Sequence, residues 1–244
     1  MAEIKSRHDW DKPKRHALTE DEQSAFVDYI RNHPIYNHWL PLFTTLLGTG
    51  LRVGELVGLR WEDCDFDENI ININHNLIYR MQDSGSVEYH ITTPKTKAGK
   101  RDIPMFSEVK KTLLNEKARQ MEHGFNPDVI DGYSGFIFCN RYGGVISPHS
   151  INRAIERISR DYNAEETQKA KAEKRKSLLL PHFSVHQLRH TFCTRFCENE
   201  TNIKIIQEIM GHADITTTMD IYNEATTKKK KESFAALEGK VKIS

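Results

Sequence analysis

The sequence is poor in the features that mark secreted, disulfide-stabilised and membrane-spanning proteins. Its 244 residues include only four cysteines, Cys64, Cys139, Cys193 and Cys197. They form no C-x-x-C pair of the kind that binds zinc, and Cys193 and Cys197, one helical turn apart, are expected to be reduced core thiols. No apolar run approaches the roughly 20 residues of a membrane span. The segment Met1–Lys14 lacks the apolar core of a signal peptide, so we expect an intracellular protein.

An excess of charge of either sign is also absent. Lysine and arginine number 35, aspartate and glutamate number 34, and the formal net charge is +1 at pH 7. This balance argues against a protein that binds nucleic acid over its whole surface, although a basic face opposite an acidic one is compatible with it. The hydrophobic content of 38% and charged content of 28% predict a folded core. The length suits one large domain or two small ones.

Apolar periodicity predicts a mostly helical chain with a few strands in its first half. A capping box at Thr19 and Glu22 opens the first helix, and Ser147-Pro148 and Ser184 open later ones. Helices are expected near residues 20–33, 39–48, 52–56, 106–121, 148–158, 184–197, 202–210 and 215–222, with a charged helix or insert at 164–176. Strands are expected at 69–74, 76–81 and 87–92, followed by a hairpin over 94–104 with Gly99 in its turn.

The stretch from His186 to Tyr222 collects the groups with most chemical potential. His186 and Arg189 are three residues apart and share one helix face. Gly211 is placed to end a second helix in the left-handed conformation, which leaves His212 on the following turn. Tyr222 comes ten residues later. A tyrosine hydroxyl ionises only near pH 10, so it acts as a nucleophile only beside positive charge, and a phosphate diester is the substrate that needs such surroundings.

Together with Thr49-Gly50-Leu51-Arg52-Val53-Gly54-Glu55-Leu56, this stretch resembles the tyrosine recombinases, the integrase family of phages and transposons. That family carries an Arg in a T-G-x-R-x-x-E-L segment, a Lys on a β-hairpin, an H-x-x-R, a G-H or G-W, and a nucleophilic Tyr. All of these occur here in the same order. The resemblance spans Leu18 to Ala225, and the P-K-T-K-A-G-K-R segment is similar to the conjugative transposon branch.

The resemblance implies a fold that is mainly α with a small antiparallel β-sheet, and a reaction that needs neither metal nor cofactor. Tyr222 would attack a phosphodiester of double-stranded DNA, form a 3′-phosphotyrosine and release a 5′-hydroxyl. The implied partners are double-stranded DNA, three further copies in a homotetramer on DNA, and an excisionase or host DNA-bending protein. No membrane is involved, and the implied location is the bacterial cytoplasm, on DNA.

The family's cationic groups map onto four positions of this sequence. Arg52 and Arg189 would hold the non-bridging phosphate oxygens, because a guanidinium can donate two parallel bonds. His186 would take part in proton transfer from the tyrosine, and His212 would donate a hydrogen bond to a non-bridging oxygen. Arg52 could instead be a surface residue paired with Glu55, and Tyr222 could be an aromatic core anchor.

A lysine on the 94–104 hairpin would protonate the leaving 5′-oxygen. Lys95 is the first choice and Lys97 the second. Lys97, Lys100 and Arg101 could all instead contact the DNA backbone from a solvated hairpin.

Two further residues are expected near the site. Glu55 would orient active-site groups, or would simply pair along its helix. His190 would be buried and hydrogen-bonded. The four-residue spacing of His182, His186 and His190 is also compatible with a metal site, but no carboxylate or thiol completes it and Arg189 would bring a cation to it.

The expected organisation is a linker over residues 1–17, a catalytic domain over 18–226, and a tail helix with a short strand over 227–244 that docks on a neighbouring protomer or on its own domain. The DNA-binding domains that precede such a linker in the family are not visible in the sequence. Two other functions are compatible with these motifs: a type IB-like topoisomerase that reseals the same strand, and a non-catalytic DNA-binding module of the same fold.

Overall fold

The computed structural model describes residues 17–81, 87–94 and 97–237. Over these residues the chain is mainly helical, as predicted. The helices are α1 (Glu20–Asn32), α2 (Leu40–Thr49), α3 (Val53–Val57), α4 (Ser107–His123), α5 (Pro148–Ala172), α6 (Val185–Asn199), α7 (Ile203–Met210) and α8 (Ile215–Leu237). Short 3-10 turns lie at Asn37–Trp39, Trp61–Asp63 and Lys97–Gly99. None of the helices in these ranges is long and apolar enough to cross a membrane.

The predicted helix-start signals are confirmed. Thr19 forms a capping box on α1, in which its Oγ1 accepts from the Glu22 N–H at 3.2 Å and its own N–H donates to Glu22 Oε2 at 2.8 Å. Ser147 Oγ accepts from the Ser150 N–H at 3.2 Å, with Pro148 in the first turn of α5. These bonds satisfy N–H groups that a helix leaves without partners at its start.

The strands divide into two small antiparallel sheets. In the part of the chain that the structure describes, the strands are β1 (Cys64–Asp65), β2 (Ile70–Ile73), β3 (Asn76–Met81), β4 (Val87–Thr92) and β5 (Arg101–Pro104). One sheet has the order β1-β2-β5, and β3 pairs with β4 in the other. The predicted hairpin over 94–104 is therefore wrong in its pairing, because β5 pairs with β2. In this register Ile71 lies opposite Ile103 and both side chains are buried, so burial of one sheet face selects the pairing.

Two helical boundaries also differ from expectation. The charged segment 164–176 is not a separate helix but mostly the last turns of α5, which Arg175 closes by folding back to Glu166, Nη2 to Oε2 at 2.9 Å. The segment 215–222 and the start of the tail form one continuous helix, α8. The expected boundary between catalytic domain and tail at residues 226–227 thus falls inside a helix.

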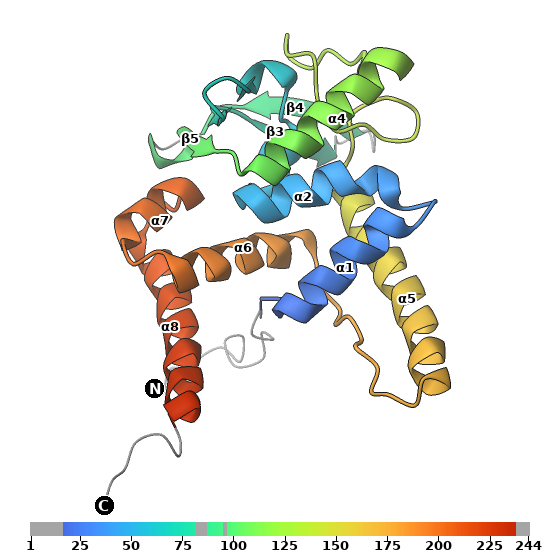
Figure 1. Cartoon of the computed structure of the whole chain (residues 1–244). Coiled ribbons are helices and arrows are strands. Elements are labelled where there is room, and N and C mark those ends of the chain that lie inside the picture. The colour runs from blue at the N-terminus through green and yellow to red at the C-terminus, as the bar shows by residue number, and fades with distance from the viewer. Residues whose placement is uncertain (1–16, 82–86, 95–96, 238–244) are drawn as a thin grey trace, which may run out of the picture.

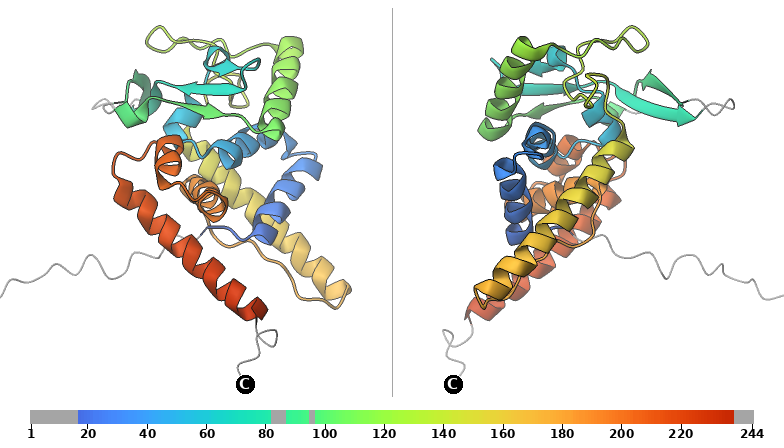
Figure 2. Two further views of the ribbon diagram at one scale, coloured as in Figure 1. Left: turned by 60° about the vertical axis from the view of Figure 1, so that its left-hand side comes forward. Right: turned by 90° about the vertical axis from the view of Figure 1, so that its right-hand side faces the viewer.

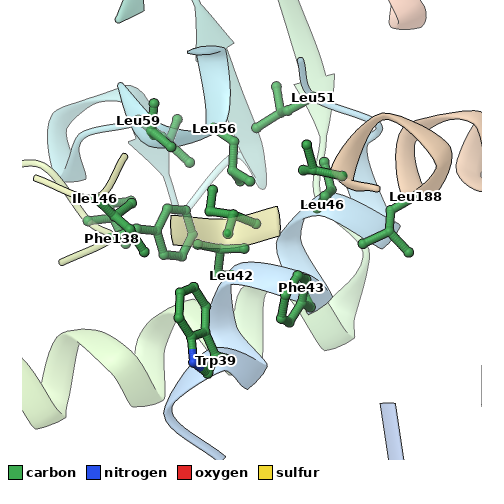
Figure 3. Close-up of a cluster of buried hydrophobic side chains, with 14 of the residues drawn as sticks. Trp39, Leu42, Phe43, Leu46, Leu51, Leu56, Leu59, Phe138, Ile146 and Leu188 are labelled. Carbon is green, nitrogen blue, oxygen red and sulfur yellow. The ribbon is translucent and has the colours of Figure 1, made fainter. Parts of the chain in front are cut away.

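Helix α2 runs through the middle of the molecule. The strands and α4 lie on one side of it, while α1, α5, α6, α7 and α8 lie on the other (Figures 1 and 2). Its apolar side chains meet residues from α3, α6 and the loops in a single core, shown in Figure 3 by Trp39, Leu42, Phe43, Leu46, Leu51, Leu56, Leu59, Phe138, Ile146 and Leu188. Because α2 ends at Gly50, this core fixes the position of Arg52, which follows directly.

Candidate active site

Arg189 lies on the buried face of α6, with 6% of its surface exposed. Its Nη1 donates to the carbonyl of Gly50, and its Nη2 donates to the carbonyl of Met210 at 2.6 Å. Burial, and then the nearby charge of Arg52, lower the pKa of the Arg189 guanidinium to about 9. The group therefore still carries its charge at pH 7, between the end of α2 and the end of α7.

Arg52 is the residue immediately before α3, and its side chain is 41% exposed. Its Nη1 donates to Glu55 Oε1 at 2.8 Å, and its Nη2 donates to the Gly211 carbonyl at 2.5 Å. The pairing with Glu55 that a surface role would require is present, yet the same guanidinium reaches the Gly211 turn. Arg52 and Arg189 therefore converge on neighbouring carbonyls, and Arg52 keeps a solvent-facing side.

Glu55 has a buried carboxylate, and 5% of the residue is exposed. Burial alone would raise the pKa of this carboxyl, but the hydrogen bonds and charge of Arg101 and the charge of Arg52 outweigh it and lower the pKa to about 2. Glu55 is therefore ionised, and it does more than pair along its own helix.

His212 stands on the turn after α7, as its motif predicts. Gly211 ends α7 in the left-handed conformation, with φ of 62°. The His212 N–H donates to the Gln207 carbonyl at 3.1 Å, and Gln207 Nε2 donates back to the His212 carbonyl at 3.1 Å. Burial, followed by the charges of Arg189 and Arg52, lowers the pKa of the His212 ring to about 4. The imidazole is therefore neutral at pH 7.

Thr218 is a site residue that the sequence reading missed. Its side chain is fully buried, and its Oγ1 lies 3.0 Å from His212 Nδ1. It precedes Tyr222 by four residues on α8, so the two share one helix face. The sequence signal that could have revealed Thr218 is its position four residues before the tyrosine.

Tyr222 is half-buried on α8 and packs against a small second core. That core comprises Phe192, Cys193, Cys197, Ile206, Met210 and Ala225. The ring is thus a packing residue as well as a candidate nucleophile, and the two roles are compatible because packing uses the ring and chemistry uses the hydroxyl. Cys193 and Cys197 are free and buried, as expected.

His186 and His190 follow each other one turn apart on α6. His186 is exposed, and its charge is among those that depress the pKa of His212, whereas His190 is half-buried. Within the described ranges, no three His, Cys, Asp or Glu side chains gather as a metal site.

The basic residues expected on the 94–104 segment have different positions. Lys95 lies outside the described residues, as does the side chain of Lys97, whose backbone is in the Lys97–Gly99 turn. Lys100 is exposed. Arg101, by contrast, does not project from a solvated hairpin: its side chain is 6% exposed and is bonded to Glu55. The expected position of Arg101 on a solvated hairpin is wrong, because its bonds to Glu55 and to the Ile209 carbonyl hold this side chain toward α3 and α7.

The arrangement is an electropositive site at which Arg52 and His186 are exposed to solvent. Arg52 and Arg101 pair with the Glu55 carboxylate. Arg189 is close enough to interact with the charge of that carboxylate, and the neutral His212 imidazole lies beside them. A cleft of about 1080 Å³ lies elsewhere, between the Ile35–Leu42 segment, α4 and the loop that includes Tyr142, and none of the site residues lines it. A cationic site with solvent-exposed side chains suits a phosphate group on a large substrate better than a small enclosed ligand.

Comparison with known proteins decides the family. Residues 16–229 match the family described as phage integrase family. The chain belongs to this family. The transposase from transposon Tn916 of Enterococcus faecalis is 34% identical to this integrase-family chain over 228 residues, which are 92% of the chain and 51% of that protein. A XerC-like tyrosine recombinase of Caldanaerobacter subterraneus subsp. tengcongensis is 26% identical over 90% of the chain and 53% of its own length.

Solved structures confirm the predicted fold of this integrase-family chain. The integrase of transposon Tn1549 in complex with transposon right end DNA is 30% identical, with a TM-score of 0.77 over 92% of this chain and 68% of that one. XerA recombinase, 21% identical with a TM-score of 0.61 over 91% of this chain and 65% of that one, shares the fold. The chain spans about half the length of the curated relatives that it matches.

Proposed function

We propose that this chain is the catalytic domain of a site-specific DNA recombinase that integrates or excises a mobile element, as its similarity to transposon integrases suggests. The observation that carries the proposal is the convergence of Arg52 and Arg189 on the turn that holds His212, with Tyr222 on the next helix. Each of these side chains has a role in phosphoryl transfer through a tyrosine.

In the proposed reaction the Tyr222 oxygen attacks a DNA phosphorus, and the bond from that phosphorus to the 5′-oxygen breaks. The products are a 3′-phosphotyrosine and a 5′-hydroxyl, with the tyrosine proton passing toward His186 and a proton reaching the leaving oxygen from Lys95. The covalent link preserves the energy of the phosphodiester, so a 5′-hydroxyl of a partner duplex reverses the step without ATP.

The two arginines stabilise the negative charge that grows on the non-bridging oxygens. Both guanidiniums now donate to main-chain carbonyls, which carry only partial charge. A phosphate oxygen carries more negative charge and forms a stronger, charge-assisted bond. Binding of a phosphate at Arg52 would therefore be favoured over its bond to the Gly211 carbonyl.

His212 acts in this proposal as a neutral hydrogen-bond donor. A neutral imidazole carries one N–H, and which nitrogen holds it depends on the bond that the other nitrogen makes. If the Thr218 hydroxyl donates to Nδ1, the proton is on Nε2, which can then donate to a non-bridging oxygen. Thr218 thus selects the useful tautomer.

Covalent attachment to DNA tests the proposal. We expect the chain to form an adduct, visible in a denaturing gel, with a pool of nicked duplexes whose sequence around the nick is randomised. The nick lets the released strand diffuse away, so the adduct accumulates. Tyr222→Phe removes only the hydroxyl and should abolish the adduct while thermal unfolding and DNA binding stay nearly unchanged. An adduct of undiminished yield with the Phe variant would refute the assignment of Tyr222.

The same proposal extends to assembly. Four protomers on two duplexes would exchange strands through a Holliday junction, with an excisionase or a host DNA-bending protein setting direction. The tail that begins within α8 would dock on a neighbouring protomer. An assay that incubates the chain with two DNA sites distinguishes this activity from that of a topoisomerase. A recombinase forms products that join the two sites, whereas a topoisomerase reseals the strand that it cut.

A further inference from the structure

Arg101 is the most completely bonded arginine of the site, although no motif assigns it a role. It begins β5, and all three of its guanidinium nitrogens donate. Nη1 and Nη2 donate to Glu55 Oε1 and Oε2 at 3.0 and 2.8 Å, and Nε donates to the Ile209 carbonyl at 2.7 Å. The side chain is 6% exposed. A surface arginine that only touches DNA would have no reason to be buried with every nitrogen engaged.

Glu55 is held by Arg101 and Arg52 together. Its Oε1 accepts from Nη1 of both residues, and its Oε2 accepts from Arg101 Nη2 and from the Arg52 main-chain N–H at 2.8 Å. The fork of Arg101 fixes the plane of the carboxylate, because two parallel bonds leave it little rotational freedom. That plane in turn decides where Oε1 holds the Arg52 guanidinium.

Arg101 also sets the net charge that a phosphate would meet. Arg52, Arg189 and Arg101 carry three positive charges against the single negative charge of Glu55. Without Arg101 the buried Glu55 carboxylate would keep only Arg52 as an ion-pair partner, and solvent-facing Arg52 would present less positive potential. Arg101 thus offsets the carboxylate and leaves Arg52 available to an anion.

The end of α7 is held by all three arginines. Its successive carbonyls at Ile209, Met210 and Gly211 accept from Arg101, Arg189 and Arg52 in that order. Cations are favoured at the C-terminal end of a helix, where carbonyls lack partners. Of the three arginines, Arg101 is the one that comes from a strand, and Figure 1 shows β5 beside α7. It therefore connects the sheet to the His212 turn.

Close packing at Gly211 tightens this connection. A Cβ on Gly211 would lie 2.8 Å from the Ala98 carbonyl oxygen and 2.8 Å from Arg101 Nη1. The turn before β5 and the turn after α7 are thus so close that no side-chain carbon fits between them at Gly211. A shift of Arg101 would displace the turn that carries His212.

We propose that Arg101 is a positioning residue for strand cleavage, which holds the Glu55 carboxylate and the end of α7 so that Arg52 and His212 face the same phosphate. The proposal rests on the recombinase function proposed above. It predicts that Arg101 acts on the chemical step and not on DNA affinity, and that charge alone cannot replace its fork. Arg101→Lys should therefore be defective, because a single ammonium cannot span both carboxylate oxygens and the Ile209 carbonyl.

The first test compares the dissociation constant for a nicked duplex selected from the randomised pool with the adduct-forming rate at saturating duplex. Arg101→Lys and Arg101→Met should lower that rate roughly tenfold to a hundredfold, because small displacements of reacting groups have effects of that size, and should leave the dissociation constant within a factor of about two of the wild-type value. The double variant Arg101→Met/Glu55→Gln should be no slower than Arg101→Met alone, because both substitutions break one unit.

Arg160 supplies the matched control. It also pairs with a carboxylate, Nη2 to Asp161 Oδ1 at 2.9 Å, but lies 71% exposed on α5. Arg160→Lys and Arg160→Met should cleave like the wild type. A wild-type cleavage rate in Arg101→Lys would overturn the proposal, as would a defect that appears only in the dissociation constant. Failure of both Arg101 variants to fold would make the residue a structural one and would overturn it too.

A second measurement needs no DNA and separates failure of this proposal from failure of the proposed function. Amide hydrogen exchange at Gly211 and His212 reports opening of the last turn of α7, since these N–H groups donate to Glu208 and Gln207. Arg101→Lys should speed their exchange roughly tenfold, because a charge-assisted bond to the turn is lost, while amides of α1 keep their rates. Unchanged exchange at both amides would overturn the positioning role even if the wild type never cleaves DNA.

Discussion

Arg189 illustrates how the site keeps charge where burial opposes it. The guanidinium is almost fully enclosed, and enclosure together with Arg52 lowers its pKa to about 9. It remains charged at pH 7 because the Gly50 and Met210 carbonyls accept from it and ionised Glu55 lies nearby. Removing one partner of such a buried group costs more than a surface bond contributes, so these carbonyls matter for stability as well as for geometry.

Thr218 provides a residue-scale prediction about the His212 tautomer. Thr218→Val keeps the shape of the side chain but removes the hydroxyl from His212 Nδ1. We expect adduct formation at saturating DNA to fall roughly tenfold to a hundredfold, by analogy with the loss seen when a partner that orients a metal-ligating histidine is removed. Thr218→Ser retains the hydroxyl and is the control, expected to stay close to the wild-type rate. Equal rates for the Val and Ser variants would mean that Thr218 only packs.

The site residues that belong to recognisable motifs could be predicted from the sequence. Arg52, His212 and Arg189 could be assigned to one site from sequence because their motifs resemble those of the tyrosine recombinases, and the structure does bring them together. Arg101 could not be assigned in the same way, because its role depends on contacts between segments far apart in the chain. Thr218 lies only six residues from His212, but its role depends on how the turn after α7 folds against α8. The predicted roles of Lys95 and Lys97 remain predictions, since the side chains lie outside the described residues.

At the scale of elements, the ends of helices build the site. The left-handed residue Gly50 ends α2 and turns its carbonyl toward Arg189, and Gly211 does the same for Arg52 at the end of α7. Both positions have positive φ, which glycine adopts without steric cost. The site thus depends on two turns that side chains would disturb.

Gly50→Ala tests this dependence. An added Cβ would lie 2.3 Å from Phe192 Cδ1, in a backbone conformation with φ of 62°. We expect a loss of about 2–4 kcal/mol of unfolding free energy, because left-handed strain and overpacking act together. Urea unfolding measures it. Gly132→Ala is the control, since its φ is 83° but nothing lies within 4 Å of the added atom, so it should lose only about 1–2 kcal/mol from strain alone. Equal losses would show that the Phe192 ring shifts to accommodate the added Cβ at little energetic cost.

Helices and strands were predictable where local sequence signals determine their bounds. Strand partners were less predictable, because contacts between distant segments determine them. The positions of β3 and β4 match expectation, and α1 and α5 begin at their predicted caps. The partner of β5 could not be read from its sequence, because burial of Ile103 against Ile71 selects it. Likewise α8 is one helix over Ile215–Leu237, although the expected organisation separated the catalytic domain from a tail helix at residues 226–227.

At the scale of the whole molecule, α8 connects the site to a part of the chain that extends away from the core. It carries Thr218 and Tyr222 near its start, and its C-terminal half extends beyond α6 and α7 in every view (Figures 1 and 2). Because a helix transmits displacement along its axis, whatever binds its far end would influence the position of the tyrosine. Docking of the tail on a neighbouring protomer would therefore make cleavage depend on assembly.

Two truncations test tail docking. The chain cut after Lys231 loses the end of α8, and the chain cut after Leu237 keeps that helix but loses the alternating Lys240-Val241-Lys242-Ile243 segment, which could pair with a sheet edge. We expect both to bind a single duplex like the full chain. Both should fail to form higher complexes with DNA in native gels and light scattering, and their cleavage should change in yield.

Two point variants in the 244-residue chain distinguish loss of tail docking from the general effect of shortening the chain or of changing its charge. Val241→Lys places a charge on the apolar side of the alternating segment, whereas Lys242→Gln alters only its polar side. Assembly should be lost in the first and kept in the second. If the shortened chains and Val241→Lys all assemble on DNA like the full chain, the tail docks on its own domain and the position of Tyr222 does not depend on a neighbour.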